Sequence, residues 1–161
     1  MQMLYQQELG GSPVQEIFAH FDLAANALDP GDEQGAGGDS PKPLGGRQRR
    51  LAEEAFDYAC RLVEGALAHG SEIDALIRQH AENWRLERMP PIDRNILRLA
   101  VYEMLYEEQV PRVVIVDEAI ELAKKFGAEN SGRFVNGLLD GILQSQGAQK
   151  TPKVTAAVEG A

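Results

Sequence analysis

The sequence predicts an all-α protein, for three reasons. Through most of the chain apolar residues recur every three or four positions, as they do on one face of an α-helix. Proline, serine and glycine stand at the borders of these stretches, where helices begin and end. No two alternating segments are joined by a short turn of the kind that forms a β-hairpin. We therefore expect a bundle of about seven helices.

The first helices precede a long loop. The opening segment MQMLYQQEL has a helical pattern, and a second helix is predicted over 12–28 with Ser12 as its N-cap and Pro13 at its first helical position. Residues 29–46 are then rich in glycine and proline, which is typical of a loop without core residues. We interpret this loop as an insertion within one domain, because too little chain precedes it to fold alone.

Proline and glycine residues delimit the later helices. Pro91 and Pro111 are each expected at a helix start, Ser71 as an N-cap, and Gly70 at a helix end. The segment VVIV alone would suit a strand, but it runs into a helical pattern without a turn. The helices are predicted at 47–69, 71–84, 91–108, 111–126 and 131–145. We thus expect one helical domain over 1–146 and a disordered tail over 147–161.

Composition and charge limit the classes of function. The chain has 161 residues, 43% of them hydrophobic and 25% charged, which is near the average of globular proteins. No apolar run is long enough to span a membrane and no signal sequence opens the chain, so we expect a soluble, cytoplasmic protein. The net charge of −9 disfavours nucleic-acid binding through the whole surface. Any contact with RNA must come from a local basic patch.

The sequence shows no sign of catalysis. Cys60 is the single cysteine, so an intramolecular disulfide is excluded and a buried structural thiol is expected. The histidines His20, His69 and His80 lack partners at metal-ligand spacing. Phosphate-binding glycine loops and nucleophile elbows are absent. We expect no enzyme activity, no metal and no cofactor.

The stretch AKKFGAENSGRFVNGLLDGIL, residues 123–143, has a plain structural interpretation as a helix connector. Gly127 is placed to end a helix in the left-handed conformation, and Lys124 and Lys125 complement the negative end of that helix. Asn130 or Ser131 then caps the next helix.

Two glycines favour a binding surface in the same stretch. Gly137 and Gly141 share one helical stripe with Phe134, beside an apolar stripe that we expect in the core (Val135, Leu138, Leu139 and Ile142). A partner can therefore approach the backbone closely. The start of this helix, with Arg133 and the two preceding lysines, is also a candidate phosphate site. A DNA-reading helix is disfavoured, because Arg133 is its one basic side chain.

Three segments resemble the NusB family of transcription antitermination factors. They are IDRNILRLAVYEM, VPRVVIVDEAIELAKKFG and SGRFVNGLLDGIL, and the similarity covers 47–143, with MLYQQELGG similar to the family's first helix. The resemblance implies a helical bundle of two packed subdomains without catalysis. It further implies that the protein pairs with NusE, a ribosomal protein of the small subunit. The pair would bind boxA RNA and help RNA polymerase, within an antitermination complex, to read through terminators of ribosomal RNA operons.

The same resemblance assigns candidate site residues. On the RNA side they are Tyr5, Asn130, Ser131, Arg133, Phe134 and Gly137, to which we add Lys124 and Lys125 as nearby cations. On the NusE side they are Asp93, Arg112, Asp117 and Glu118. An acidic ridge would steer a basic ribosomal partner, although Asp117 and Glu118 could equally serve only to complement the positive end of their helix.

One departure from the family's pattern leaves a second function open. NusB proteins usually carry an arginine-rich segment before the first helix, whereas this chain has no lysine or arginine before Lys42. The cluster RQRR at 47–50 could replace it or could be an ordinary solvated helix start. The alternative function is a helical module that binds NusE or a second copy of itself, with little affinity for RNA. The same domain also precedes RNA cytosine methyltransferases by resemblance, so a fragment of such an enzyme is a further alternative.

Overall fold

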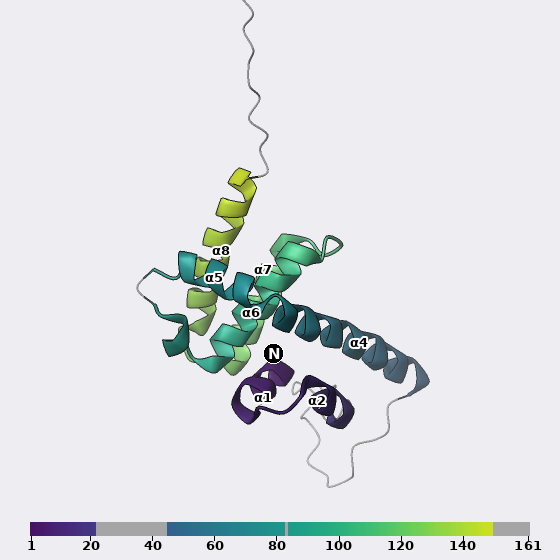
Figure 1. Cartoon of the computed structure of the whole chain (residues 1–161). Helices are drawn as coiled ribbons and strands as arrows, with labels where there is room; N and C mark the ends of the chain where they lie inside the picture. The colour runs from purple at the N-terminus through teal and green to yellow at the C-terminus, as the bar shows by residue number, and fades with distance from the viewer. Residues whose placement is uncertain (22–44, 83, 150–161) are drawn as a thin grey trace, which may run out of the picture. The chain divides into compact units, whose positions relative to one another are not determined.

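The computed structural model describes residues 1–21, 45–82 and 84–149. These residues form seven α-helices and one short 3-10 helix, without a β-strand in any of the three ranges (Figure 1). The predicted all-α fold class is therefore confirmed. The chain divides into two compact units, Met1–Gly70 and Ser71–Ala161, and each is described by itself.

The first unit contains α1 (Gln2–Gly10), α2 (Val14–His20) and α4 (Gly46–Ala68). Gly11, at φ 65°, ends α1 in the left-handed conformation that glycine adopts most readily. Helix α1 packs against α2, and the ring of Phe56 on α4 stacks on Phe21 with centroids 5.8 Å apart. The edge of Phe18 on α2 also meets the Phe56 ring, so aromatic contacts join α2 and α4.

The predicted start of α2 is one residue early. Pro13 is the N-cap, with φ −55° and ψ 139°, and Val14 begins the helix, so Ser12 is not the cap. Helix α2 ends at His20, and residues 22–44, which include most of the predicted loop at 29–46, lie outside the described residues. Because proline lacks an N–H, a sequence pattern cannot distinguish N-cap from N1 in this segment.

Helix α4 matches the predicted range to within one residue at each end, but its apolar stripe is only partly buried. Val63 and Ala66 are buried, whereas Leu51 is 57% exposed. Cys60 is half-buried rather than fully buried. Burial, with the carboxylates of Glu64 and Asp57 nearby, raises the pKa of the Cys60 thiol, which keeps it in its unreactive protonated form.

The second unit contains α5 (Gly70–His80), η2 (Leu86–Arg88), α6 (Pro91–Tyr106), α7 (Arg112–Phe126) and α8 (Ser131–Gln149). Pro91 occupies the first turn of α6 and Pro111 caps α7, so both prolines stand at helix starts as predicted. Ser71 does not cap α5, because the helix already begins at Gly70. Helix α5 also ends at His80, before the predicted end at residue 84.

Helices α6, α7 and α8 form the core of this unit. Helix α7 packs against both α6 and α8, and the VVIV segment lies within α7. The predicted core stripe of α8 is confirmed, because Val135, Leu139 and Ile142 are fully buried and Leu138 is 5% exposed. Helix α8 runs to Gln149, past its predicted end, and residues 150–161 of the predicted tail lie outside the described residues.

In the described parts of the chain, no helix combines the length and the apolar character that a membrane span needs. Nor does any group of three or more histidine, cysteine, aspartate or glutamate side chains in those parts stand close enough together to hold a metal ion.

Candidate nucleic-acid interface

The turn between α7 and α8 depends on a close contact at Gly127. Its backbone is extended (φ −89°, ψ −171°), so the predicted left-handed conformation is wrong. Glycine is needed for a different reason. A Cβ atom at this position would lie 2.5 Å from the Cβ and Oγ atoms of Ser131 and 2.6 Å from the carbonyl oxygen of Ala123. The turn can therefore close this tightly only without a side chain at residue 127.

Ser131 links this turn to α6 through buried hydrogen bonds. Its Oγ accepts the N–H of Ala128 at 2.8 Å and donates to Oδ2 of Asp93 at 2.9 Å. The backbone N–H of Ser131 in turn donates to the carbonyl of Ala128 at 2.9 Å. The carbonyl of Asn130 accepts the N–H of Phe134, which makes Asn130 the residue before the first helical position of α8.

Asp93 is the buried acidic group of the site. It is 3% exposed, and its Oδ1 atom has no hydrogen-bond partner among the residues that the structure describes. Burial raises the pKa of the Asp93 carboxyl, while the hydrogen bond from Ser131 opposes that shift. Asp93, which the resemblance assigns to the NusE side, is therefore buried rather than on the surface. Its position in the first turn of α6 did not reveal that Ser131, at the start of α8, lies against it.

An aromatic hollow of about 180 Å³ lies next to this hydrogen-bonded turn. Its lining residues come from the connector after α5, the start of α6 and the α7–α8 turn: Trp84, Pro90, Asp93, Ala128, Asn130, Ser131 and Phe134. The rings of Trp84 and Phe134 are in contact, with centroids 5.7 Å apart and planes tilted by 58°. Trp84 is 53% exposed and Phe134 is half-buried, so part of this aromatic pair faces solvent.

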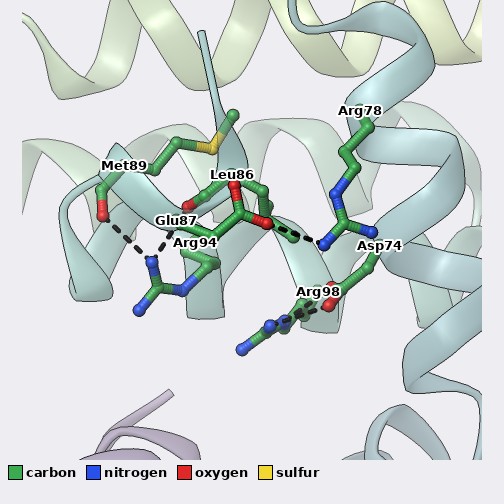
Figure 2. A network of polar contacts seen from close by, with 7 residues as sticks. All are labelled: Asp74, Arg78, Leu86, Glu87, Met89, Arg94 and Arg98. Carbon is green, nitrogen blue, oxygen red and sulfur yellow. Dashed lines mark hydrogen bonds and ion pairs between the residues drawn. The ribbon is translucent and has the colours of Figure 1, made fainter.

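Arginine side chains hold the connector that carries Trp84. Arg94 Nη1 donates to the carbonyls of Leu86 at 2.9 Å and Met89 at 3.2 Å, as Figure 2 shows. Arg78 on α5 pairs with Glu87 at 2.9 Å (Figure 2). These contacts hold the 3-10 helix that follows α5 in the place where the sequence predicted the last turn of α5 and the connector after it.

A bidentate ion pair joins α5 to α6 beneath the connector. Arg98 donates from Nε and Nη2 to the two carboxylate oxygens of Asp74, at 2.8 and 2.9 Å (Figure 2). Both side chains are largely buried, with 22% and 17% of their surface exposed. Because a partly buried bidentate pair has a strict geometry, it fixes the orientation of α5 against α6.

Three cationic side chains lie near the start of α8, where Glu129 in the turn is an exposed acid. Arg133 is exposed and has no ion-pair partner within the described ranges. Lys124 pairs with Glu121 at 2.7 Å, but both side chains are exposed, and such pairs are weak enough to exchange for a phosphate. Lys125 lies over the ring of Phe126, 5.5 Å from its centroid. The three cations thus stand at the end of α7 and in the first turn of α8.

The two α8 glycines differ in their surroundings. Gly137 is exposed, and an added Cβ would meet no atom within 4 Å. At Gly141 an added Cβ would lie 3.5 Å from Cδ2 of His80, which is an ordinary contact. Neither glycine is therefore required by packing inside the described chain, and Gly137 leaves backbone open to a partner.

The remaining candidate residues lie elsewhere. Asp117 and Glu118 are exposed on α7, and Arg112 is half-buried at its first position. Tyr5 is 37% exposed on α1, in the first unit. Ser131, predicted to contact RNA, is only 3% exposed, so its hydroxyl serves the turn rather than an RNA surface.

Trp84 is the site residue that sequence reasoning missed. It is the chain's single tryptophan and stands in a polar connector between two helices. The signal that could have found it is weak: tryptophan is enriched at interfaces, but a singly exposed apolar side chain is ordinary.

Known proteins are similar to this chain over most of its length. The sequence profile of the NusB family matches residues 1–144. The transcription antitermination protein NusB of Sorangium cellulosum is 40% identical over 147 residues, which is 91% of this chain and 88% of that protein. The NusB of Elusimicrobium minutum is 53% identical over 97 residues, 60% of this chain and 69% of that protein.

Solved structures show the same fold. A T. maritima NusB structure, 35% identical, superimposes with a TM-score of 0.64 and covers 89% of this chain and 84% of its own. A structure described as the antitermination factors NusB and NusE in complex with dsRNA is 26% identical, with a TM-score of 0.65, and covers 89% of each chain. The profile match, the sequence relatives and the common fold together show that this chain belongs to the NusB family.

Proposed function

We propose that this protein is a transcription antitermination factor that binds boxA-type RNA together with NusE and supports read-through by RNA polymerase in ribosomal RNA operons. Family membership supports the proposal, as do relatives that carry the name antitermination protein. A structural neighbour contains NusB and NusE together with dsRNA, which supports a joint contact of the two proteins with RNA. The role requires no catalysis, and its place is the cytoplasm, where the RNA is transcribed.

The observation that carries the RNA side of the proposal is the start of α8. An exposed, unpaired Arg133 stands there beside the exposed amide of Asn130 and an aromatic hollow. The N–H groups of a first helical turn lack intrahelical partners and attract anions. These are the groups that single-stranded RNA binds. Cations contact its phosphates, whereas amide and aromatic side chains contact its bases.

The charge balance explains why a partner is needed. The net charge of the chain is −9, which repels RNA. We therefore expect the few local cations to bind RNA only weakly when the protein acts alone. Asp117 and Glu118 are exposed acids on α7 and suit a basic ribosomal protein. Such a partner contributes positive charge of its own to the RNA surface.

A titration of boxA RNA with and without NusE tests the proposal. We expect weak binding by the protein alone, with a salt dependence equivalent to about two to four neutralised phosphates. Adding NusE should strengthen binding and steepen the salt dependence. If NusE binds but RNA affinity does not rise above that of NusE alone, the alternative function as a protein-binding helical module is correct instead.

A further inference from the structure

Three arginines of the first unit lie together at the start of α4. Arg47, Arg49 and Arg50 are all exposed and stand in the first five residues of that helix. The described residues of this unit, 1–21 and 45–70, contain one further lysine or arginine, which is Arg61. In a chain with a net charge of −9, the three arginines therefore produce a local positive potential that attracts an anion.

The stability of α4 does not explain why these arginines stand there. The N-terminus of a helix carries partial positive charge, so that acids stabilise the first turn and cations destabilise it. The first turn of α4 contains no acid, and the carboxylates of this helix follow in later turns, at Glu53, Glu54, Asp57 and Glu64. The order of charges along α4 is the reverse of the order that would stabilise it.

Contacts within the described chain leave the arginines open to a partner. Gln48 caps the first turn without them, since its Oε1 accepts the backbone N–H of Gly45 at 3.2 Å. Arg50 pairs with Glu54 at 3.4 Å, but the two side chains are 83% and 64% exposed, and such pairs are weak. Arg47 and Arg49 have no ion-pair partner within the described ranges.

The chemistry of the cluster fits the phosphates of an RNA strand. A guanidinium group donates two parallel hydrogen bonds to phosphate oxygens and keeps its charge at any physiological pH. Arg47 and Arg50 are separated by about 4.5 Å along the helix axis, so neighbouring phosphates of one strand can meet both. The exposed side chain that follows them, Leu51, offers a base neither a hydrogen bond nor an aromatic ring. Contacts of this kind hold the backbone and do not read the sequence.

We propose that Arg47, Arg49 and Arg50 form a second RNA contact, which binds phosphates of the RNA strand whatever the base sequence. This contact belongs to the first unit and shares no residue with the candidate interface at the start of α8, which belongs to the second unit. The inference rests on the proposed function. It adds a surface that strengthens RNA binding and takes no part in the recognition of boxA.

The salt dependence of RNA binding in the presence of NusE tests this contact. The wild type and the triple variant Arg47→Gln, Arg49→Gln and Arg50→Gln are titrated with boxA RNA between about 50 and 200 mM salt. Each phosphate contact on a single strand contributes about 0.7 to the slope of log affinity against log salt, so the slope should be smaller by about 2 in the variant. Across this salt range the affinity of the wild type should therefore fall about 20-fold more than that of the variant.

An RNA of the same length with a scrambled boxA sequence tests whether the contact reads bases. We expect the wild type and the triple variant to differ in slope by the same amount with this RNA, because phosphates are common to every sequence. A difference that appears with boxA RNA and disappears with the scrambled RNA would overturn a sequence-independent contact.

Arg61→Gln is the matched control for the single substitutions. Arg61 is exposed on the same helix, about 16 Å along the axis from Arg50, and lies over the ring of Tyr58. That distance exceeds the screening length of about 10 Å at 0.1 M salt. Arg61→Gln should therefore leave the slope of the wild type unchanged, whereas Arg50→Gln should lower it by about 0.7. Equal effects of these two variants would show that only the overall charge matters and would overturn the contact.

Two further measurements keep the result interpretable. Replacing the same three arginines by lysine preserves their charge and should preserve most of the salt slope. Unfolding midpoints of the glutamine variants should not fall, because cations are removed from the positive end of a helix. If the wild type binds boxA RNA with NusE and the triple glutamine variant keeps the same slope, the cluster is an ordinary solvated helix start and the proposed function stands. Absence of RNA binding by the wild type with NusE would instead overturn the proposed function itself.

Discussion

Ser131 and Asp93 lie 38 positions apart in the sequence, yet Ser131 Oγ donates to Asp93 Oδ2 at 2.9 Å in the interior of the protein. Both residues are 3% exposed. This bond joins the start of α8 to the start of α6, and through Ala128 it also holds the turn after α7. The candidate RNA surface is therefore built on a buried polar contact.

Removing the hydroxyl of Ser131 should destabilise the protein. Ser131→Ala leaves the N–H of Ala128 and Oδ2 of Asp93 without their partner, and an unsatisfied buried group costs about 1–3 kcal/mol. Urea unfolding measures this change. Ser145→Ala is the control on the same helix, because it loses only a hydroxyl bond to the carbonyl of Ile142, and it should cost less than about 1 kcal/mol. Equal effects of the two substitutions would contradict a special role for the Asp93 contact.

Asp93 should make stability depend on pH in a direction opposite to that of most carboxylates. Burial raises the pKa of Asp93 above its value in the unfolded chain, so the folded state retains this proton at a higher pH. Its contribution is fully favourable below the unfolded pKa of 3.8 and is lost as pH rises through the raised pKa. Asp93 is the only titratable residue among those lining the hollow, and Arg94, next to it on α6, donates to backbone carbonyls.

The measurement is the difference in unfolding free energy between the wild type and Asp93→Asn, from pH 4 to pH 7. Because all other carboxylates are shared, their effects cancel in the difference. We expect the unfolding free energy of the wild type to rise relative to that of Asp93→Asn as the pH falls. If this difference stays constant, or falls as the pH falls, the pKa of Asp93 is not raised in the folded protein.

Alanine substitutions should separate the two structural roles of glycine near the site. At Gly127 an added methyl collides with Ser131 and the Ala123 carbonyl, so Gly127→Ala should destabilise by about 1–3 kcal/mol. At Gly137 the methyl meets nothing and removes a flexible residue from a helix, so Gly137→Ala should stabilise by about 0.5–1 kcal/mol. Thermal unfolding checks both. If Gly137 leaves room for RNA, the stabilised variant should nevertheless bind RNA more weakly, and unchanged binding would remove Gly137 from the interface.

Asn130→Asp should weaken RNA binding without harming the fold. Asn130 is exposed before the first position of α8, where asparagine and aspartate are both good caps and a negative charge suits the helix dipole. Stability should therefore stay within about 0.5 kcal/mol of the wild type or rise slightly. A carboxylate at this place repels phosphate, so the affinity for boxA RNA should fall, alone and with NusE. Undiminished affinity would mean that this turn is only a connector.

Charge reversal at Glu118 should slow association with NusE. Glu118 is exposed on α7, and an acid in such a position accelerates the encounter with a basic protein more than it strengthens the final complex. We expect a lower association rate constant for Glu118→Lys and a weaker dependence of that rate on salt. Glu53→Lys, on the exposed surface of α4, makes the same change in net charge and is the control. Equal rates for the two variants would show that only the overall charge matters.

The sequence alone determined the helical fold class, most helix borders in the second unit and the family. These features depend on local chemistry: apolar residues at helical spacing, prolines that lack an N–H, and segments such as FVNG that belong together in one family. The core stripe of α8 was predictable for the same reason, since Val135 to Ile142 repeat at helical intervals and must face one side. Exposure of Asn130 and Arg133 likewise followed from a polar turn at a helix start.

Only the tertiary structure decided how distant residues meet. Asp93 looked like a surface acid, because its burial depends on α8 lying across α6 and not on its own neighbours in sequence. Gly127 looked like a left-handed cap, because the atoms that exclude a side chain there come from Ser131 and Ala123 after the turn has closed. Trp84 was not predicted as a site residue. Its partner Phe134 is 50 positions away, and only the packing of the helices brings the two ring centroids to 5.7 Å. Long-range contacts of this kind are set by the packing of whole helices, which no local pattern specifies.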